Sequence, residues 1–320
     1  SQVAVSDVLI TVQDDSDTAG MVVSTTTVTV SEPSGVGSYL LTLTSQPVAS
    51  VVVNLSTTDP GECSVPASVT LTASTWRTGK SVAVTAVDDP IIDGVQSCVV
   101  QATAASSDAN YAGMQASNVT VKVQDNDVAG VLYTLGKSTL QEANDNTLLV
   151  AKLTSQPFAD VTIGLANSDP GECALPSSIT LNSSNWQTGI GIMVQSVDDD
   201  LDDETQPCTL QSTVSSSDNH YHALAVTPLQ LTVADDETAG FVVTPTTLTV
   251  HEPHSTADFG VTLTSQPTAT VTITLTSGDA TECSAPATLT LTPLTWQTGV
   301  TATIQAVDDR IADDARPCLV

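Results

Sequence analysis

Basic residues are scarce in this sequence. Its 320 residues include only 7 Lys and Arg against 36 Asp and Glu, which gives a formal net charge of −29 at pH 7. Nucleic acids and anionic membrane surfaces attract proteins through clustered Lys and Arg side chains. The sequence therefore argues against both nucleic acid and an anionic membrane as partners.

Long apolar runs are missing as well. No stretch approaches the roughly 18 apolar residues of a membrane-spanning helix, so no membrane span is predicted in this segment. No signal peptide is recognisable and the first residue is Ser1, which we interpret as a mature or excised segment. Hydrophobic residues still make up 40% of the chain. Because Val, Ile and Leu alternate with Thr and Ser, we expect folded cores rather than disorder.

An internal repeat of 110 residues organises the chain. The string LTSQP and one Trp recur at this interval, together with two Cys, one Glu and an acid-rich stretch. So many residue types in one register indicate a domain repeated in tandem. We predict whole repeats at 18–127 and 128–237, the closing strand of a preceding repeat at 1–17, and a repeat truncated before its last strand at 238–320. Excision from a longer array explains the partial ends best; the alternative is that residues 1–15 complete the third repeat of a neighbouring copy.

Each repeat has the pattern of short β-strands. Val, Thr and Leu alternate between turn-forming residues, and no helical period persists over twelve residues. Seven strands in about 110 residues are typical of an all-β, immunoglobulin-like β-sandwich. In the first repeat the predicted strands are 21–30, 38–45, 50–57, 68–72, 80–87, 97–105 and 117–125.

The cysteines come in pairs within each repeat, 35 residues apart. Close pairs such as CxxC, which metal sites need, are absent. We therefore predict one disulfide per repeat, with free buried thiols as the alternative, and an oxidising, extracellular or cell-surface location. The predicted pairs are Cys63–Cys98, Cys173–Cys208 and Cys283–Cys318.

Three acidic elements occur in each full repeat, far apart in sequence. One is a single Glu at the end of the first predicted strand, another is Asp-Asp-x-x-x-Asp after the strand at 80–87, and the third closes the repeat. In the first repeat they are Glu32, then Asp88, Asp89 and Asp93, then Asp125, Asn126 and Asp127. In the second repeat they are Glu142, then Asp198, Asp199 and Asp203, then Asp235, Asp236 and Glu237. The partial repeats supply Asp14, Asp15 and Asp17, and Glu252, Asp308, Asp309 and Asp313.

The strands that precede the second and third acidic elements run in the same direction if one strand lies between them in the chain. Their carboxylates then meet at one end of the sandwich, where they repel one another unless a cation binds. Hard oxygen ligands without His or Cys favour Ca²⁺ over Zn²⁺, copper or Mg²⁺. A solvated acidic surface is the simpler alternative, and the twelve-residue EF-hand loop is absent.

These motifs together resemble Calx-β domains. The residues that carry the resemblance are Val87-Asp88-Asp89, Ser107-Asp108-Ala109-Asn110-Tyr111 and Asp125-Asn126-Asp127, with Ser217-Asp218-Asn219-His220-Tyr221 in the second repeat. The resemblance covers nearly the whole chain and implies a seven-stranded sandwich that binds Ca²⁺ at one end. Sensor members of the family carry a further acid where this chain has Gln96, Gln206 and Arg316. This departure indicates fewer or more permanently filled sites than in a sensor.

The closing acids lie immediately before the next repeat, so bound Ca²⁺ would fix the junction between consecutive repeats. We therefore expect a structural segment of a secreted or surface stalk, adhesin shaft or filament, of the kind found in bacterial adhesins, whose partners are neighbouring repeats or copies end to end. A glycan- or cell-binding adhesion module and a calcium-sensing array are the alternatives. Only ten residues are aromatic, so a surface for stacking sugars is not evident.

Catalysis is not expected. The four histidines, His220, His222, His251 and His254, have Asn110, Ala112, Ser31 and Ser34 as their counterparts in the first repeat. No nucleophile motif or phosphate-binding loop is present, so the sequence favours a role other than that of an enzyme.

Overall fold

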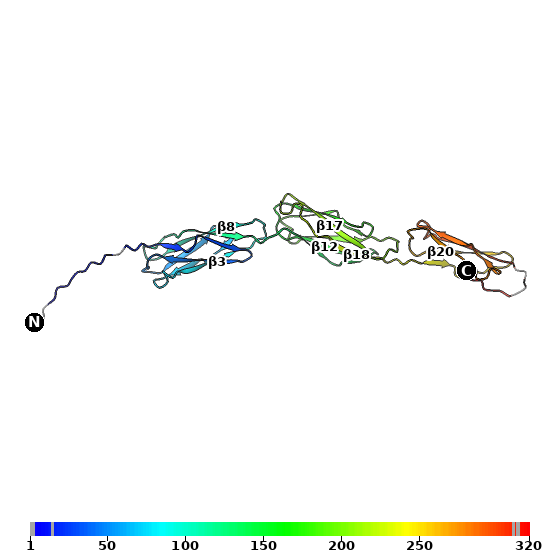
Figure 1. The fold of residues 1–320 in the computed structure, drawn as a ribbon, viewed down its shortest axis with the longest axis horizontal. Coiled ribbons are helices and arrows are strands. Elements are labelled where there is room, and N and C mark those ends of the chain that lie inside the picture. The colour runs from blue at the N-terminus through cyan, green and yellow to red at the C-terminus, as the bar shows by residue number, and fades with distance from the viewer. Residues whose placement is uncertain (1–3, 14–15, 309–310, 312–313) are drawn as a thin grey trace. The chain divides into compact units, whose positions relative to one another are not determined.

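The computed structural model describes residues 4–13, 16–308, 311 and 314–320. All regular structure in these residues is β-strand (Figure 1). No helix in this part of the chain is long and apolar enough to cross a membrane. The chain divides into two compact units, one of residues 1–130 with 154–158 and one of residues 131–153 with 159–320.

The first unit contains a sandwich of two sheets that pack through their alternating apolar residues. Its four-stranded sheet has the order β1-β3-β7-β5 and its five-stranded sheet has the order β2-β9-β8-β4-β6. All neighbours pair antiparallel except β2 and β9, which are parallel. The bounds are β1 Met21–Val23, β2 Thr27–Ser31, β3 Val36–Leu43, β4 Val51–Thr57, β5 Cys63–Ser64, β6 Ser68–Leu71, β7 Lys80–Ala86, β8 Gln96–Ala105 and β9 Val119–Gln124.

The first predicted strand, 21–30, is in fact two strands in different sheets. Pairing with β3 ends at Ser24, whose amide donates to the carbonyl of Leu40. Pairing with β9 begins at Thr26, whose carbonyl accepts from the amide of Thr120. A change of sheet does not interrupt the alternation of apolar and polar residues, because every second residue is partly buried in β1 and buried in β2. The strand β5 was not predicted, since two residues are too short to show a period.

The SDxxY and LTSQP motifs of the first sandwich contact each other through buried side chains. The Tyr111 side chain is 1% exposed, and its hydroxyl donates to the Ser45 carbonyl over 2.6 Å. The buried carboxylate of Asp108 accepts from the amide of Val48 over 2.9 Å. Both repeated motifs therefore have a structural role, in which the SDxxY loop anchors the LTSQP loop.

The second unit contains a sandwich of the same topology. Its sheets have the orders β10-β12-β16-β14 and β11-β18-β17-β13-β15. The bounds are β10 Val131–Leu135, β11 Thr139–Gln141, β12 Asn146–Leu153, β13 Val161–Asn167, β14 Cys173–Ala174, β15 Ser178–Leu181, β16 Ile190–Ser196, β17 Gln206–Ser216 and β18 Leu229–Ala234.

The same unit also contains a third, less complete sandwich. Its sheets have the orders β19-β20-β24-β22 and β21-β23, and the described residues of 238–320 include no counterpart of β9 or β18. The predicted repeat boundaries are compatible with this strand order. The bounds are β19 Phe241–Thr244, β20 Thr256–Leu263, β21 Val271–Thr274, β22 Cys283–Ser284, β23 Thr288–Leu291 and β24 Val300–Ala306.

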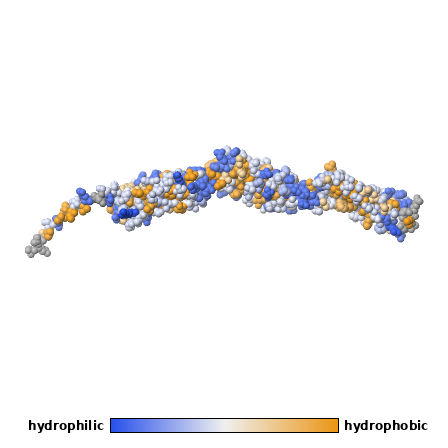
Figure 2. All heavy atoms as spheres, viewed as in Figure 1, coloured by the Kyte–Doolittle hydropathy of each residue, from blue (hydrophilic) through white to orange (hydrophobic). Residues whose placement is uncertain are grey.

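The surface reflects the composition. Figure 2 shows hydrophilic and hydrophobic residues intermingled on the visible face of the sandwiches, and a hydrophobic run within the segment before β1. In that segment Val8, Leu9 and Ile10 are each more than three-quarters exposed. The alternation of the closing strand is thus present in residues 4–13, but it lies outside any sheet.

Candidate metal centre

The acid-rich loop and the closing acids meet at one end of the first sandwich. Strand β7 ends at Ala86, just before the double Asp, and β9 ends at Gln124, just before Asp125. The amides of Asp93 and Gly94 donate to Oδ2 of Asp125 over 3.0 and 2.9 Å. The two acidic elements therefore lie together in the structure, as predicted. The two strands lie in opposite sheets rather than in one.

The carboxylates of the first sandwich form two groups. In each group, one ligand oxygen per residue lies within 4.8 Å of the others. We name the six residues the first cage: Glu32, Asp125 and Asp127 form one group, and Glu62, Asp89 and Asp93 form the other.

The second sandwich repeats the arrangement with more acid. Glu142, Asp235 and Glu237 form one group within the same limit, and Asp198, Asp236 and Glu237 form another. Asp199, Asp203 and Asp235 all raise the pKa of Glu172, which places them near its carboxylate. The second cage comprises Glu142, Glu172, Asp198, Asp199, Asp203, Asp235, Asp236 and Glu237.

Backbone amides hold the loops of the cages in place. Oδ1 of Asp125 accepts from the amide of Asp127 over 2.7 Å, and Oδ1 of Asp89 accepts from the amide of Ile91 over 2.8 Å. Asp235 and Asp199 make the same contacts in the second sandwich. Short-range bonds of this kind are typical of Asp in turns. They orient the carboxylates toward one another although their charges repel.

Burial and mutual repulsion raise the pKa of the cage glutamates. In the first cage the pKa of Glu32 rises from 4.5 to about 7, mainly because the carboxylate is desolvated and then because Asp89, Asp125 and Asp88 lie nearby. The pKa of Glu62 is raised as well, by desolvation first and then by Asp93 and Asp89. Carboxylates rather than cations are the main charged neighbours in both cases.

The second cage has the same electrostatics. Glu142 and Glu172 are only 2% and 6% exposed. The pKa of each rises from 4.5 to about 7, with desolvation as the largest cause. The pKa of Glu237 also rises to about 7, through desolvation and its contact with Asp235. An ionised carboxylate is costly in such surroundings unless a positive charge compensates it.

Two buried carboxylate oxygens lack a hydrogen-bond partner among the described residues. They are Oδ2 of Asp127 and Oε2 of Glu237, which occupy equivalent positions in the two cages. Buried polar atoms are nearly always satisfied, so each points to a missing partner. The donor set is all oxygen, with six or more carboxylates in a loop-built site, and this fits Ca²⁺.

Most of the predicted ligands of the first two repeats lie in or beside a cage. Asp88 is exposed and lies beside the first cage, where it raises the pKa of Glu32 and Asp127. The side chain of Asn126 is exposed, and its backbone amide donates to Glu32. For these two residues, as for the members of the cages, the assignment as a ligand stays a prediction.

The partial repeats are different. Asp14, Asp15, Asp309 and Asp313 lie outside the described residues. Asp17, Glu252 and Asp308 are exposed, and none of them belongs to a group of three acids in the described part of the chain. A closing strand like β9, which places acids in the first cage, has no counterpart among the residues of 238–320 that the structure describes.

Sequence reasoning missed one member of each cage. Glu62 and Glu172 come from the strings DPGEC before β5 and β14, and their carboxylates face the acid-rich loops. The signal was present, because Glu62, Glu172 and Glu282 recur at the 110-residue interval.

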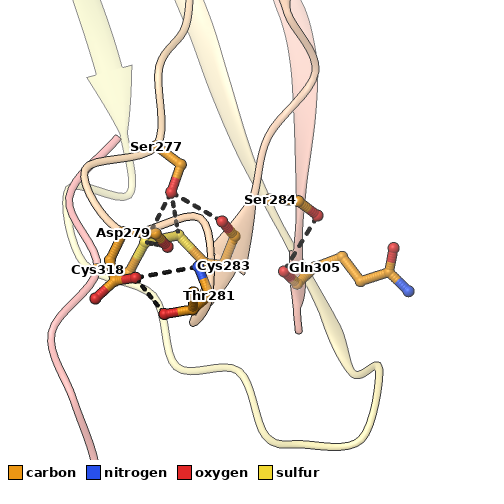
Figure 3. Close-up of a disulfide and its surroundings, with 7 residues drawn as sticks. All are labelled: Ser277, Asp279, Thr281, Cys283, Ser284, Gln305 and Cys318. Carbon is orange, nitrogen blue, oxygen red and sulfur yellow. Dashed lines mark hydrogen bonds between the residues drawn. A yellow bond between two sulfur atoms is a disulfide. The ribbon is translucent and has the colours of Figure 1, made fainter. Parts of the chain in front are cut away.

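The three predicted disulfides are present in the structure. Cys63–Cys98, Cys173–Cys208 and Cys283–Cys318 each join residues 35 apart, and free cysteines are absent. The first two link β5 to β8 and β14 to β17, strands that belong to opposite sheets. Figure 3 shows the third, where the Ser277 hydroxyl donates to the carbonyl of Cys283 over 2.8 Å and lies 3.2 Å from Sγ of Cys318.

Fold and site together define tandem immunoglobulin-like β-sandwiches with an acidic cage at one end of each complete sandwich. No protein-family profile matches the sequence, and no curated protein matches it.

Solved structures do resemble the chain. The calcium binding domain CBD12 of CALX1.1 is 12% identical over 67% of this chain and 99% of that one, with a TM-score of 0.31. CBD12 from CALX1.2 is 10% identical over 63% and 83%, with a TM-score of 0.26. Domains 4 and 5 of the S-layer protein SbsC are 10% identical over 57% and 75%, with a TM-score of 0.25. These scores are too low to carry a function from those proteins to this chain.

Proposed function

We propose that this chain is a structural segment of an extracellular stalk, adhesin shaft or filament, stiffened by Ca²⁺ and stapled by disulfides. The observation that supports it most directly is the pair of cages, in which carboxylates converge, half-buried for the most part in the first cage and including the buried Glu142 and Glu172 in the second, without a cation among their main charged neighbours. Ca²⁺ would be held by the carboxylates of the first and second cages, and it would supply the missing positive charge.

The cages lie next to short connections in the chain. Only Thr238, Ala239 and Gly240 separate the closing acids of the second cage from β19. The amide of Ala239 donates to Oδ2 of Asp202 over 2.6 Å, and the carbonyl of Gly240 accepts from the amide of Thr264 over 3.0 Å. The connection is thus hydrogen-bonded to the acid-rich loop before it and to the LTSQP loop after it.

The acid-rich loop also contacts the LTSQP loop directly. In the second unit, the amide of Gln266 donates to the carbonyl of Asp200 over 2.6 Å. In the first unit, the amide of Gln156 donates to the carbonyl of Pro90 over 2.7 Å. Both bonds join equivalent positions, 110 residues apart. A cation that orders the loop of Asp89 and Asp93 would therefore also order the contact made by Pro90.

The charges of a cage affect how rigidly its loops are held. Without a cation, the carboxylates of a cage repel one another, and the loops that carry them are free to separate. With Ca²⁺ bound, the same oxygens converge on one charge and the loops become rigid. Extracellular calcium modules bind at about 10⁻⁴–10⁻³ M, which keeps them occupied where calcium is abundant. The disulfides fit an oxidising environment of that kind.

The partners follow from this role. We propose that neighbouring repeats, or further copies placed end to end, are the principal partners, and that the cages stiffen the connections between them. A glycan or cell-surface partner stays a prediction. The small number of aromatic residues, 3% of the chain, does not favour a surface for stacking sugars.

Calorimetric titration and thermal melting test the proposal. The chain, freed of metal over a chelating resin, should bind several Ca²⁺ ions and melt at a higher temperature with 2 mM Ca²⁺ than without it, by roughly the RT ln(1 + [L]/Kd) of ligand linkage. Mg²⁺ should bind more weakly, because it keeps its water shell.

The matched variants lie in the second sandwich. Glu142→Gln removes a carboxylate of the second cage, whereas Asp160→Asn removes one from an exposed loop. The first should weaken Ca²⁺ binding and the second should not. Absence of Ca²⁺ binding by the unchanged chain, or equal weakening in the two variants, would overturn the proposed function.

A further inference from the structure

Each cage is built half from one sheet and half from the other. In the first sandwich, Glu62 precedes β5 and Asp89 follows β7, and both of these strands belong to the four-stranded sheet. Glu32 follows β2 and Asp125 follows β9, which belong to the five-stranded sheet. The spacing of the carboxylates therefore depends on how closely the two sheets approach at this end.

The disulfide crosses from sheet to sheet at the same place. Cys63 directly follows Glu62, and both cysteines of the pair are fully buried. Cys98 is in register with Val121 of β9, the strand that leads to Asp125. The disulfide therefore links β5, which follows Glu62, to β8. Strand β8 is the neighbour of β9, which leads to Asp125.

The backbone alone holds Glu62 weakly. Strand β5 has two residues, paired with Ala86 and Thr85 of β7, and the carbonyl of Glu62 accepts from the amide of Val87 over 2.9 Å. The carboxylate of Glu62 meanwhile faces the like charges of Asp93, Asp89 and Asp59. An edge strand this short is poorly placed to resist that repulsion without a further link.

We propose that Cys63–Cys98 and Cys173–Cys208 are positioning disulfides, which hold the two halves of each cage at the spacing that Ca²⁺ needs, so that Ca²⁺ affinity depends on the intact cross-link. The inference rests on the proposed function. Residues that orient metal ligands from outside the ligand set commonly change metal affinity by about 10–100-fold, and we expect a loss in that range when one cross-link is removed.

Thermodynamic linkage makes the effect reciprocal. If the cross-link raises the affinity for Ca²⁺ by some factor, bound Ca²⁺ must shift the thiol–disulfide equilibrium toward the disulfide by the same factor. A disulfide with a purely structural role has no such dependence on Ca²⁺ while the sandwich stays folded. This reciprocity separates positioning of the ligands from general stabilisation of the fold.

The test removes one cross-link and keeps the other as an internal control. Cys173→Ala together with Cys208→Ala should weaken the Ca²⁺ sites of the second cage by about 10-fold or more and leave those of the first cage unchanged in a calorimetric titration. The matched control is Ile163→Ala in β13, which truncates a fully buried side chain of the same sandwich. It should lower the melting temperature while Ca²⁺ affinity stays within twofold of that of the unchanged chain.

A second measurement keeps the sequence unchanged. The fraction of reduced thiol is measured at equilibrium with a dithiol reductant, with and without Ca²⁺, under conditions where circular dichroism shows an intact fold. Ca²⁺ should shift the equilibrium toward the disulfide by the factor found in the titration. Full affinity in the double alanine variant, or a redox equilibrium insensitive to Ca²⁺, would overturn the positioning role. Failure of the unchanged chain to bind Ca²⁺ would instead overturn the proposed function.

Discussion

Replacing Glu172 with Gln should change stability in opposite directions with and without calcium. The Glu172 side chain is 6% exposed, and its pKa rises from 4.5 to about 7. At 1.36 kcal/mol per pKa unit, ionisation at pH 8 costs the metal-free fold at most about 3.4 kcal/mol. Water near the loop screens part of this repulsion, so we expect the neutral amide to recover about 1–2 kcal/mol.

The assay is thermal unfolding at pH 8 in metal-free buffer and again in 2 mM Ca²⁺. In metal-free buffer, the transition of the second sandwich should rise by about 5 °C, since 1 kcal/mol moves the midpoint of a domain of this size by about 4 °C or more. In Ca²⁺ the variant loses a carboxylate from the cage, so the gain in melting temperature caused by Ca²⁺ should shrink. Asp160→Asn removes an equal charge from an exposed loop and should change stability by less than about 0.5 kcal/mol.

A lower melting temperature of Glu172→Gln in metal-free buffer would refute the reasoning, because it would mean that the buried carboxylate stabilises the fold without a cation. An unchanged gain from Ca²⁺ would remove Glu172 from the cage, even if the metal-free result agreed with expectation.

Three further predictions concern the pH dependence of stability, the pH dependence of the calcium effect, and the Tyr111 hydroxyl. Because the pKa of Glu32 and Glu142 is raised from 4.5 to about 7, the metal-free fold takes up protons in that window that the unfolded chain does not, so its melting temperature should fall as the pH rises from about 4.5 to 7; a rise would contradict this. The gain in melting temperature from Ca²⁺ should increase over the same window, because protons and Ca²⁺ compete for these carboxylates, and melting curves at pH 5, 6 and 7.5 measure both effects. Tyr111→Phe removes the hydroxyl that bonds to Ser45 and should cost about 1 kcal/mol in urea unfolding, without weakening Ca²⁺ binding.

Much of the fold could be predicted because its physical causes are local. Alternation of apolar residues follows directly from packing one face of a strand, and strands such as 80–87 and 97–105 came within a residue or two of β7 and β8. The disulfides could be predicted because the spacing of the cysteines recurs in every repeat and gives every cysteine a partner. The convergence of the acid-rich loop with Asp125 followed from counting strand directions.

The features that could not be predicted depend on contacts between segments that are distant in the sequence. The change of sheet between Met21–Val23 and Thr27–Ser31 leaves the alternation unbroken, so one long strand was the natural expectation. Glu62 becomes part of a cage only because β5 lies beside β7, and β5 is too short to be recognised in the sequence. Its pKa is raised by desolvation and then by like charges, among them Asp89 and Asp93 of the acid-rich loop and Asp125 after β9, which are far from Glu62 in the sequence.

Small-angle X-ray scattering of the whole chain, with and without Ca²⁺, tests the central claim most directly. If the cages bind Ca²⁺ and thereby stiffen the connections, scattering in metal-free buffer should indicate a flexible chain with a broad distribution of dimensions. Added Ca²⁺ should then narrow that distribution and lengthen the maximum dimension, with a midpoint that matches the calorimetric affinity. Identical scattering curves in chelator and in saturating Ca²⁺ would contradict the account.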